Sequence, residues 1–176
     1  MQNENGSTPD VLLLRAIHDK HIHIDKLLET RGQILIALAG LILTFSLTRF
    51  IDKSFHAYTL QEYGWIIISL SSLLAISLSV SGIKPKLFVK GAKSKPVNLF
   101  YYGDFIQKLS QSEYSEELVK RLGDKQRVAE SFTEELYSLA NKVLIPGFRK
   151  IRLAYTIFLL GLILGFIFLV TASLLG

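Results

Sequence analysis

The chain of 176 residues contains no cysteine. It therefore forms no disulfide bond, and it cannot hold a metal ion through thiolate ligands. Its first thirty residues lack an apolar stretch followed by a cleavage site, so we expect no removable signal peptide. No nucleophile with its base and no pair of catalytic acids stands out, and we therefore expect no enzymatic activity.

Charge is almost absent from three apolar blocks, which cover residues 34–51, 64–83 and 154–175. About 18 helical residues extend over roughly 27 Å, close to the thickness of the hydrocarbon core. The blocks, together with the lack of strand alternation, predict an all-α membrane protein with three transmembrane helices. Aromatic residues between the first two blocks and at the start of the second fit the interfacial belt and predict a tight hairpin; they are Phe55, Tyr58, Tyr63 and Trp65.

Basic residues are distributed unevenly around these blocks. Four precede the first block, two (Arg49 and Lys53) lie at the turn, fourteen lie between residues 84 and 153, and none follows the third block. The positive-inside rule places the N-terminus and the long middle segment in the cytoplasm, with the turn and the C-terminus outside. We thus expect a cytoplasmic N-terminal helix over 1–33 and a small cytoplasmic helical bundle over 84–153.

The polar segments carry helical patterns. Apolar residues recur on one face of the N-terminal segment, which continues without a breaker into the first span; they are Leu14, Ile17, Ile24 and Leu28. The capping-box pattern Ser110–Glu113 begins a further helix, and Gly123 ends it. A second helix is expected from Lys125 to about Leu144. Its apolar stripe is Val128, Phe132, Leu136, Leu139 and Val143, and Pro146-Gly147 breaks it before a last helix begins near Phe148.

Small residues mark one face of the second span and one face of the third. The second span has Ser71, Ala75, Ser79 and Gly82 on one side, and the third contains Gly161 and Gly165. Such faces let helices approach closely in lipid. They either pack the helices of one subunit, or they build a homo-oligomer or line a polar pathway. Because no acidic residue, lysine or histidine lies inside a span, a pump or ordinary secondary transporter is disfavoured.

Two clusters outside the spans are candidate ligand sites. His18 and His21 are one helical turn apart, but no second cluster supplies further metal ligands, so we expect no metal and a packed, hydrogen-bonded His21. The segment Asn98–Asp104 surrounds three aromatic residues with polar ends beside a basic loop. It either stacks a base and holds a phosphate, or packs the bundle with Gly103 in a turn. The net charge of +6 over residues 84–153 is explained most simply by lipid headgroups rather than nucleic acid.

Four motifs together resemble the transmembrane Pycsar effectors. They are Asn98-Leu-Phe-Tyr-Tyr-Gly-Asp104, Ser110-x-x-Glu-Tyr114, Glu135-Leu-Tyr-x-Leu-Ala140, and Arg149-Lys-Ile-Arg-Leu-Ala-Tyr155. The segment from Ile24 to Gln33 is similar to the N-terminal part of that family, more loosely. The resemblance extends over nearly the whole chain.

The resemblance implies a bacterial antiphage effector of the inner membrane, encoded beside a pyrimidine cyclase. On infection the cyclase makes cyclic CMP or cyclic UMP, of which we slightly favour cyclic CMP. The effector then impairs the membrane and causes abortive infection, with its C-terminus in the periplasm. We expect no cofactor and a homo-oligomeric assembly. From their chemistry, not from the family, we choose Tyr101 and Tyr102 to stack the base, Asn98 to bind its edge, and Arg149 and Lys150 to bind the phosphate.

Two other functions compete with this interpretation. One is a constitutive small channel or transporter subunit, and the other is a membrane anchor that recruits a cytoplasmic partner through its basic bundle. A cyclase gene beside the gene for this chain favours the effector.

Overall fold

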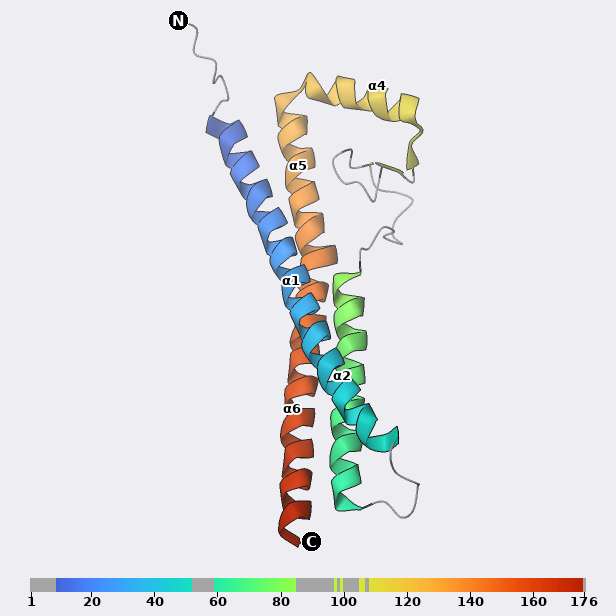
Figure 1. Cartoon of the computed structure of the whole chain (residues 1–176). Coiled ribbons are helices and arrows are strands. Elements are labelled where there is room, and N and C mark those ends of the chain that lie inside the picture. The colour runs from blue at the N-terminus through green and yellow to red at the C-terminus, as the bar shows by residue number, and fades with distance from the viewer. Residues whose placement is uncertain are drawn as a thin grey trace, which may run out of the picture. The chain divides into compact units, whose positions relative to one another are not determined.

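The computed structural model describes residues 9–51, 59–84, 97, 99, 105–106 and 108–175. The chain divides into two compact units (Figure 1). Unit 1 comprises Met1–Lys26 and Pro85–Ile145, and unit 2 comprises Leu27–Lys84 and Pro146–Gly176. Helices form almost all of the described part, which contains no strand, and three of them are long and apolar enough to cross a membrane. The predicted all-α membrane fold is confirmed.

Helix α1 runs from Pro9 to Ile51 without interruption. This confirms that the N-terminal helix continues into the first span. Three hydroxyl groups in the apolar half donate to carbonyl oxygens of the preceding turn, so they need no water. The bonds run from Thr44 to Gly40, from Ser46 to Ile42 and from Thr48 to Phe45, at 2.8–2.9 Å.

Helix α2 runs from Leu60 to Ile83, four residues longer at its start than the apolar block. Thr59 is its N-cap, and the Thr59 backbone N–H donates to Oε2 of Glu62 at 2.7 Å. Because the helix begins this early, Tyr63 and Trp65 lie on its first turns and not in the hairpin turn. Phe55 and Tyr58 lie outside the described residues.

Helices α4 (Gln111–Leu122) and α5 (Lys125–Leu139) belong to unit 1. The predicted capping box is confirmed: the Ser110 backbone N–H donates to Oε2 of Glu113 at 2.8 Å, and Gly123 follows the last residue of α4. Asp124 then caps α5 by accepting from the backbone N–H groups of Gln126 and Arg127. The predicted apolar stripe of α5 is half-buried at every position.

The capping box makes the first turn of α4 sensitive to acid. The Ser110 backbone N–H, and then its hydroxyl, hold the pKa of Glu113 below its usual 4.5. A carboxylate with a lowered pKa stabilises the folded state above its unfolded pKa, and this contribution is lost as the pH falls through the folded value. We expect the first turn of α4 to fray in that acidic window, measured by the Cα chemical shifts of residues 111–114. Glu113→Gln should remove this pH dependence, whereas Glu117→Gln on the exposed side should keep it; equal behaviour would contradict the assignment.

Pro146 does not break the chain as predicted. A π-helix over Ala140–Leu144 joins α5 to α6, which runs from Ile145 to Leu175 through both Pro146 and Gly147. The Ile145 backbone N–H donates to the carbonyl of Ala140, five residues back. This wide turn stands just before the proline, whose ring would otherwise meet the carbonyl four residues earlier and which has no N–H to donate. The helix therefore tolerates the proline.

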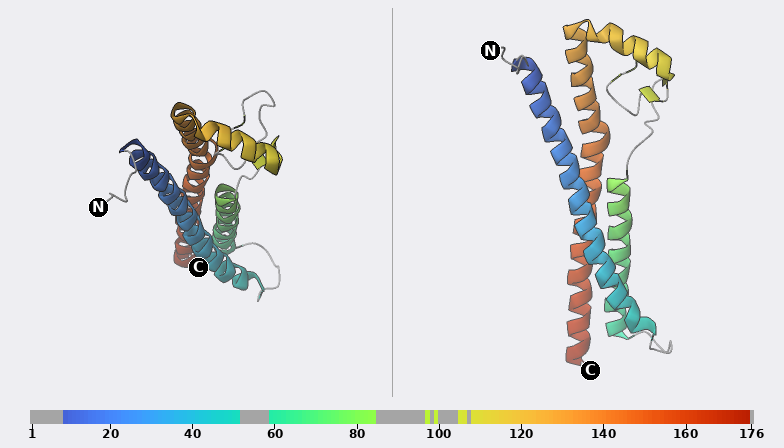
Figure 2. Two further views of the ribbon diagram at one scale, coloured as in Figure 1. Left: turned by 90° about the horizontal axis from the view of Figure 1, so that it is seen from above. Right: turned by 45° about the horizontal axis from the view of Figure 1, so that its top comes forward.

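The core of unit 2 lies between α1, α2 and α6, which run side by side (Figures 1 and 2). Its fully buried members are small or aliphatic: Leu35, Ala39, Ala75 and Ala154, with Phe158 beside them. The large apolar side chains of these helices point outward instead, as in α6 with Leu159, Leu160, Ile163 and Phe166. Outward apolar and inward small side chains are what a bundle surrounded by lipid requires.

Candidate functional site

The spanning bundle of unit 2 is closed by backbone-to-side-chain contacts between α2 and α6. A Cβ added at Gly161 would collide with the side chain of Ser71, and one added at Gly165 would collide with Ile68. Gly64 of α2 faces Gly165, and a Cβ on either glycine would lie 2.9 Å from the other's carbonyl oxygen. Hydrogen on these α-carbons is therefore what allows the two helices to approach, since no larger group fits.

A second set of close contacts lies at the other end of the bundle. A Cβ at Gly32 of α1 would lie 2.5 Å from Cγ2 of Ile83 on α2, and a Cβ at Gly82 would lie 3.2 Å from Ile151 on α6. A Cβ at Gly147 of α6 would lie 2.6 Å from Cδ2 of Leu28 on α1. Each of the three helices thus contributes one glycine to this set of close contacts: Gly32 of α1, Gly82 of α2 and Gly147 of α6.

Of the predicted packing residues, Ser71, Ala75, Ser79, Gly161 and Gly165 are all buried. Ser71 and Gly161 contact each other, while Gly165 contacts Ile68, which small-residue spacing did not identify. The signal for Ile68 was its place three residues before Ser71, on the same face of the helix.

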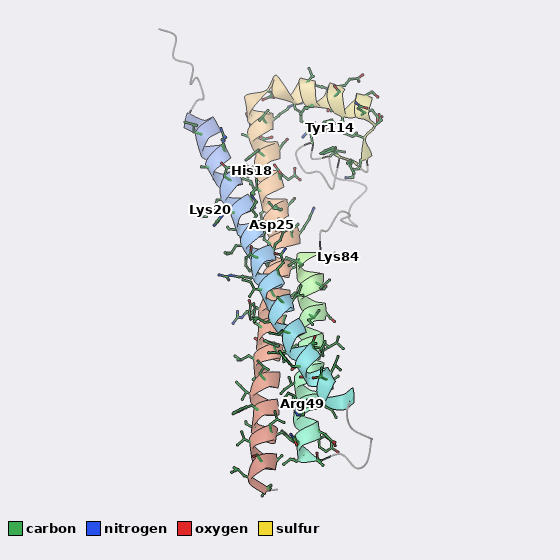
Figure 3. The ribbon with its side chains drawn as sticks, viewed as in Figure 1. His18, Lys20, Asp25, Arg49, Lys84 and Tyr114 are labelled. Carbon is green, nitrogen blue, oxygen red and sulfur yellow. The ribbon has the colours of Figure 1, made fainter. Side chains whose placement is uncertain are left out.

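Basic residues at the ends of the spans have defined partners. The Lys150 ammonium donates to the carbonyl oxygen of Ser81 at 3.2 Å and to its hydroxyl at 2.5 Å, so a cation lies at the C-terminus of α2, where the helix dipole favours it. At the opposite end the Arg49 guanidinium lies 6.0 Å from the Trp65 ring centroid. Figure 3 labels Arg49, in the last turn of α1, and Lys84, the C-cap of α2.

The Tyr155 hydroxyl donates to the carbonyl of Arg31 at 3.2 Å and so links α6 to α1. This bond lies beside the Arg149–Tyr155 motif that opens the third span, which places part of that motif at a helix–helix contact. Arg149 itself is exposed.

In unit 1, Arg121 joins three parts of the chain. Its Nη1 donates to the Ser131 hydroxyl at 2.9 Å, and its Nη2 donates to the carbonyl of Val97 at 3.0 Å. Leu99, two residues further on, is only 1% exposed. The start of the aromatic segment is therefore attached to the α4–α5 pair. Nothing in the sequence pattern distinguishes Arg121, which makes these bonds, from its exposed neighbour Lys120 at the same helix end.

Of the residues chosen for the nucleotide, Asn98, Tyr101 and Tyr102 lie outside the described residues. The next aromatic residue, Phe105, stacks on Tyr114 with ring centroids 4.4 Å apart. Tyr114 is labelled on α4 in Figure 3. Tyr114 ends the Ser110–Tyr114 motif and Phe105 directly follows the Asn98–Asp104 motif, and both residues lie within unit 1.

The histidines of α1 have different surroundings. His21 bonds through Nδ1 to the carbonyl of Ile17 at 2.9 Å, as predicted for a packed histidine. His18 lies 5.6 Å from the Phe132 ring, and its buried Nδ1 has no hydrogen-bond partner in the described part. Burial raises the pKa of Glu135, in α5 of the same unit, and the nearby His18 offsets part of the rise. The described residues contain no group of three side chains able to hold a metal ion.

The fold and this site define an all-α membrane protein: three helices long and apolar enough to span, closed by glycine contacts, and a second, polar helical unit. The chain matches the Pycsar effector protein domain over residues 12–174, and it belongs to that family of antiphage defence effectors. Neither the comparison with curated proteins nor that with solved structures gave a match.

Proposed function

We propose that this chain senses a cyclic pyrimidine nucleotide, made by a partner cyclase, and then impairs the inner membrane so that the infected cell dies. The observation that carries the proposal is the family match over residues 12–174, on a chain with three helices able to span. Cyclic CMP is the first candidate ligand and cyclic UMP the second. The N-terminus and unit 1 lie in the cytoplasm, where the fourteen basic residues of segment 84–153 meet the positive-inside rule.

Continuity of the helices supports a direct response. Helix α1 belongs to both units, and the π-helix leads from α5 into α6 with no intervening loop. A ligand that binds one arrangement of unit 1 better than another shifts the population by that difference in affinity. Repacking in unit 1 is then carried to the spans by helices and not by a flexible linker.

Dye leakage from liposomes that contain the purified protein tests the function. Cyclic CMP, cyclic UMP and cyclic AMP are added separately, and we expect leakage with at least one of the two pyrimidine nucleotides and none with cyclic AMP. Leakage that needs no nucleotide would instead indicate the constitutive channel. A sealed liposome under all three nucleotides would count against the effector mechanism and leave the anchor.

The nucleotide site is proposed at Tyr101, Tyr102 and Asn98 for the base and Arg149 for the phosphate. Loss of base stacking costs about 1–3 kcal/mol, so Tyr101→Ala should weaken binding about five- to a hundredfold in a titration. Arg149→Ala should weaken it similarly through the lost charge-assisted bond. Lys150 is a weaker candidate because its ammonium already binds Ser81. Arg152→Ala, a neighbouring exposed arginine, is the control; unchanged affinity in both Tyr101→Ala and Arg149→Ala would refute this placement.

A further inference from the structure

Helix α2 presents two different faces to its neighbours. Gly64, Ser71 and Gly82 lie on the face toward α6, where each of them contacts or approaches that helix. Ile83 contacts Gly32 of α1 instead. Ile68, which contacts Gly165 of α6, lies between these two directions. Successive helical residues are about 100° apart, so Ser69, Ser72 and Ser79 all lie within roughly 40° of Ile83, and Ser79 lies at the edge of this face nearest Ile68. We call these three residues the serine stripe; it lies on the side of α2 that Ile83 turns toward α1.

The hydroxyls of the serine stripe have no hydrogen-bond partner in the described part of the chain. Ser72 and Ser79 are also fully buried, at 0% exposure. Other serines of the same helix are satisfied: Ser71 donates to the carbonyl of Ile68, and Ser77 donates to that of Leu73, both at 2.9 Å. Ser71 and Ser77 thus bond to a carbonyl of their own preceding turn, as serines in spanning helices commonly do. The three unsatisfied hydroxyls all lie on one face of the helix.

This arrangement is costly while the bundle is closed. A buried polar group without a partner destabilises the state that buries it, whereas water would satisfy the same group. The core residues of α1 at this level are Leu35 and Ala39, whose side chains have no hydrogen-bonding group. The closed contact of α1 with α2 thus buries polar groups that have no partner in the described part of the chain.

We propose that the serine stripe is the surface that water and small ions enter when the effector is active. Helix α1 moves off α2, while α2 stays on α6 through Gly161 and Gly165. The exposed hydroxyls then line a hydrated path that carries no charged group and selects weakly among small ions. This inference rests on the proposed function, in that it says where the impaired membrane becomes permeable.

The lack of cysteine in the chain makes the path measurable. Ser72→Cys and Ser79→Cys are treated in proteoliposomes with a charged thiosulfonate that does not cross lipid, with and without cyclic CMP or cyclic UMP. Thiol reaction follows access to water. We expect the rate at both positions to rise at least about tenfold with the nucleotide that causes leakage. Ser71→Cys on the α6 side and Ser77→Cys on the exposed side are matched controls and should not change.

Leakage without faster reaction at Ser72→Cys and Ser79→Cys would overturn the inference and leave the proposed function standing. Equal reaction with and without nucleotide would also overturn it, because the path would be wet at rest. An equal rise at Ser71→Cys would show that α6 separates as well, which contradicts the assignment of the path to the α1 side.

A second measurement needs no nucleotide. Ser72→Ala and Ser79→Ala remove an unsatisfied hydroxyl, so each should raise the Tm of the closed protein by about 2–4 °C, whereas Ser77→Ala should not. If neither nucleotide causes leakage, the proposed function fails and the hydrated path fails with it, and this comparison then tests only whether the closed contact is strained. A higher Tm in both stripe variants supports a strained closed contact between α1 and α2. An unchanged or lower Tm in both shows that the hydroxyls are satisfied and overturns it.

Discussion

Gly161→Val is expected to separate α2 from α6 and to lower the Tm of the purified protein more than any other single change in the spans. The added Cβ alone would collide with the Ser71 side chain, whose own Cβ is fixed by the helix. Overpacking of this kind costs about 1–3 kcal/mol, and the loss of close backbone contact adds to it because packing holds helices together in lipid. We expect a fall in Tm of roughly 5 °C or more in a thermal melt.

Gly40→Val is the matched control for this change. A Cβ at Gly40 of α1 has no atom within 4 Å, so the same substitution meets open space there. Both variants carry the same β-branched residue in a helix, and the helix propensity term therefore cancels. Gly40→Ala should even be slightly stabilising, by about 0.5–1 kcal/mol. Equal melting of Gly161→Val and Gly40→Val would show that the glycine contact is not what closes the bundle.

A disulfide between α1 and α2 is expected to abolish nucleotide-triggered leakage. A Cβ at Gly32 would lie 3.9 Å from the Cβ of Ile83, and disulfides have Cβ–Cβ distances of about 3.5–4.5 Å. In Gly32→Cys with Ile83→Cys, the Ile83 methyl group that crowds this position is removed. The remaining neighbour, Cδ1 of Ile151 at 3.1 Å, is the end of a flexible side chain. The oxidised protein should be sealed against dye under cyclic CMP and cyclic UMP alike.

Reduction should restore leakage in the same protein, which separates the effect of the bond from that of the two substitutions. Gly32→Cys alone, treated with the same oxidant, is the further control. Leakage from the fully oxidised double variant would show that α1 stays on α2 during activation. A reduced variant that fails to leak, next to an unaltered chain that leaks, would show that the substitutions themselves damage the protein.

Local signals in the sequence determined a large part of the fold. Three blocks of about twenty residues, uncharged except for Arg49 near the end of the first, specify spans whatever their partners, because the rest of the chain is too small to cover so much apolar surface. The Ser110–Glu113 capping box acts within four residues, and its prediction held. The prediction that Pro146 breaks the helix was wrong, since a helix can widen into a π-turn before a proline when its neighbours keep it in place. The early start of α2 was missed because the Thr59–Glu62 box stands outside the apolar block.

The candidate sites divide in the same way. Motif resemblance identified the family, and the match over residues 12–174 shows it. Which serine of α2 has a partner was beyond the sequence, because six serines surround the helix and all have the same chemistry. The same holds for Arg121, whose bonds to Val97 and Ser131 join residues 24 and 10 positions away.

The sequence by itself determined that this is a membrane protein, how many times it can cross the bilayer, and the family to which it belongs. These follow from composition and short motifs, which act without regard to distant residues. Only the tertiary structure decided that Gly161 contacts Ser71, that Lys150 binds the end of α2, and that Ser72 and Ser79 are buried without partners. Each of these depends on which faces of two helices meet, and that is fixed by packing between segments far apart in the chain.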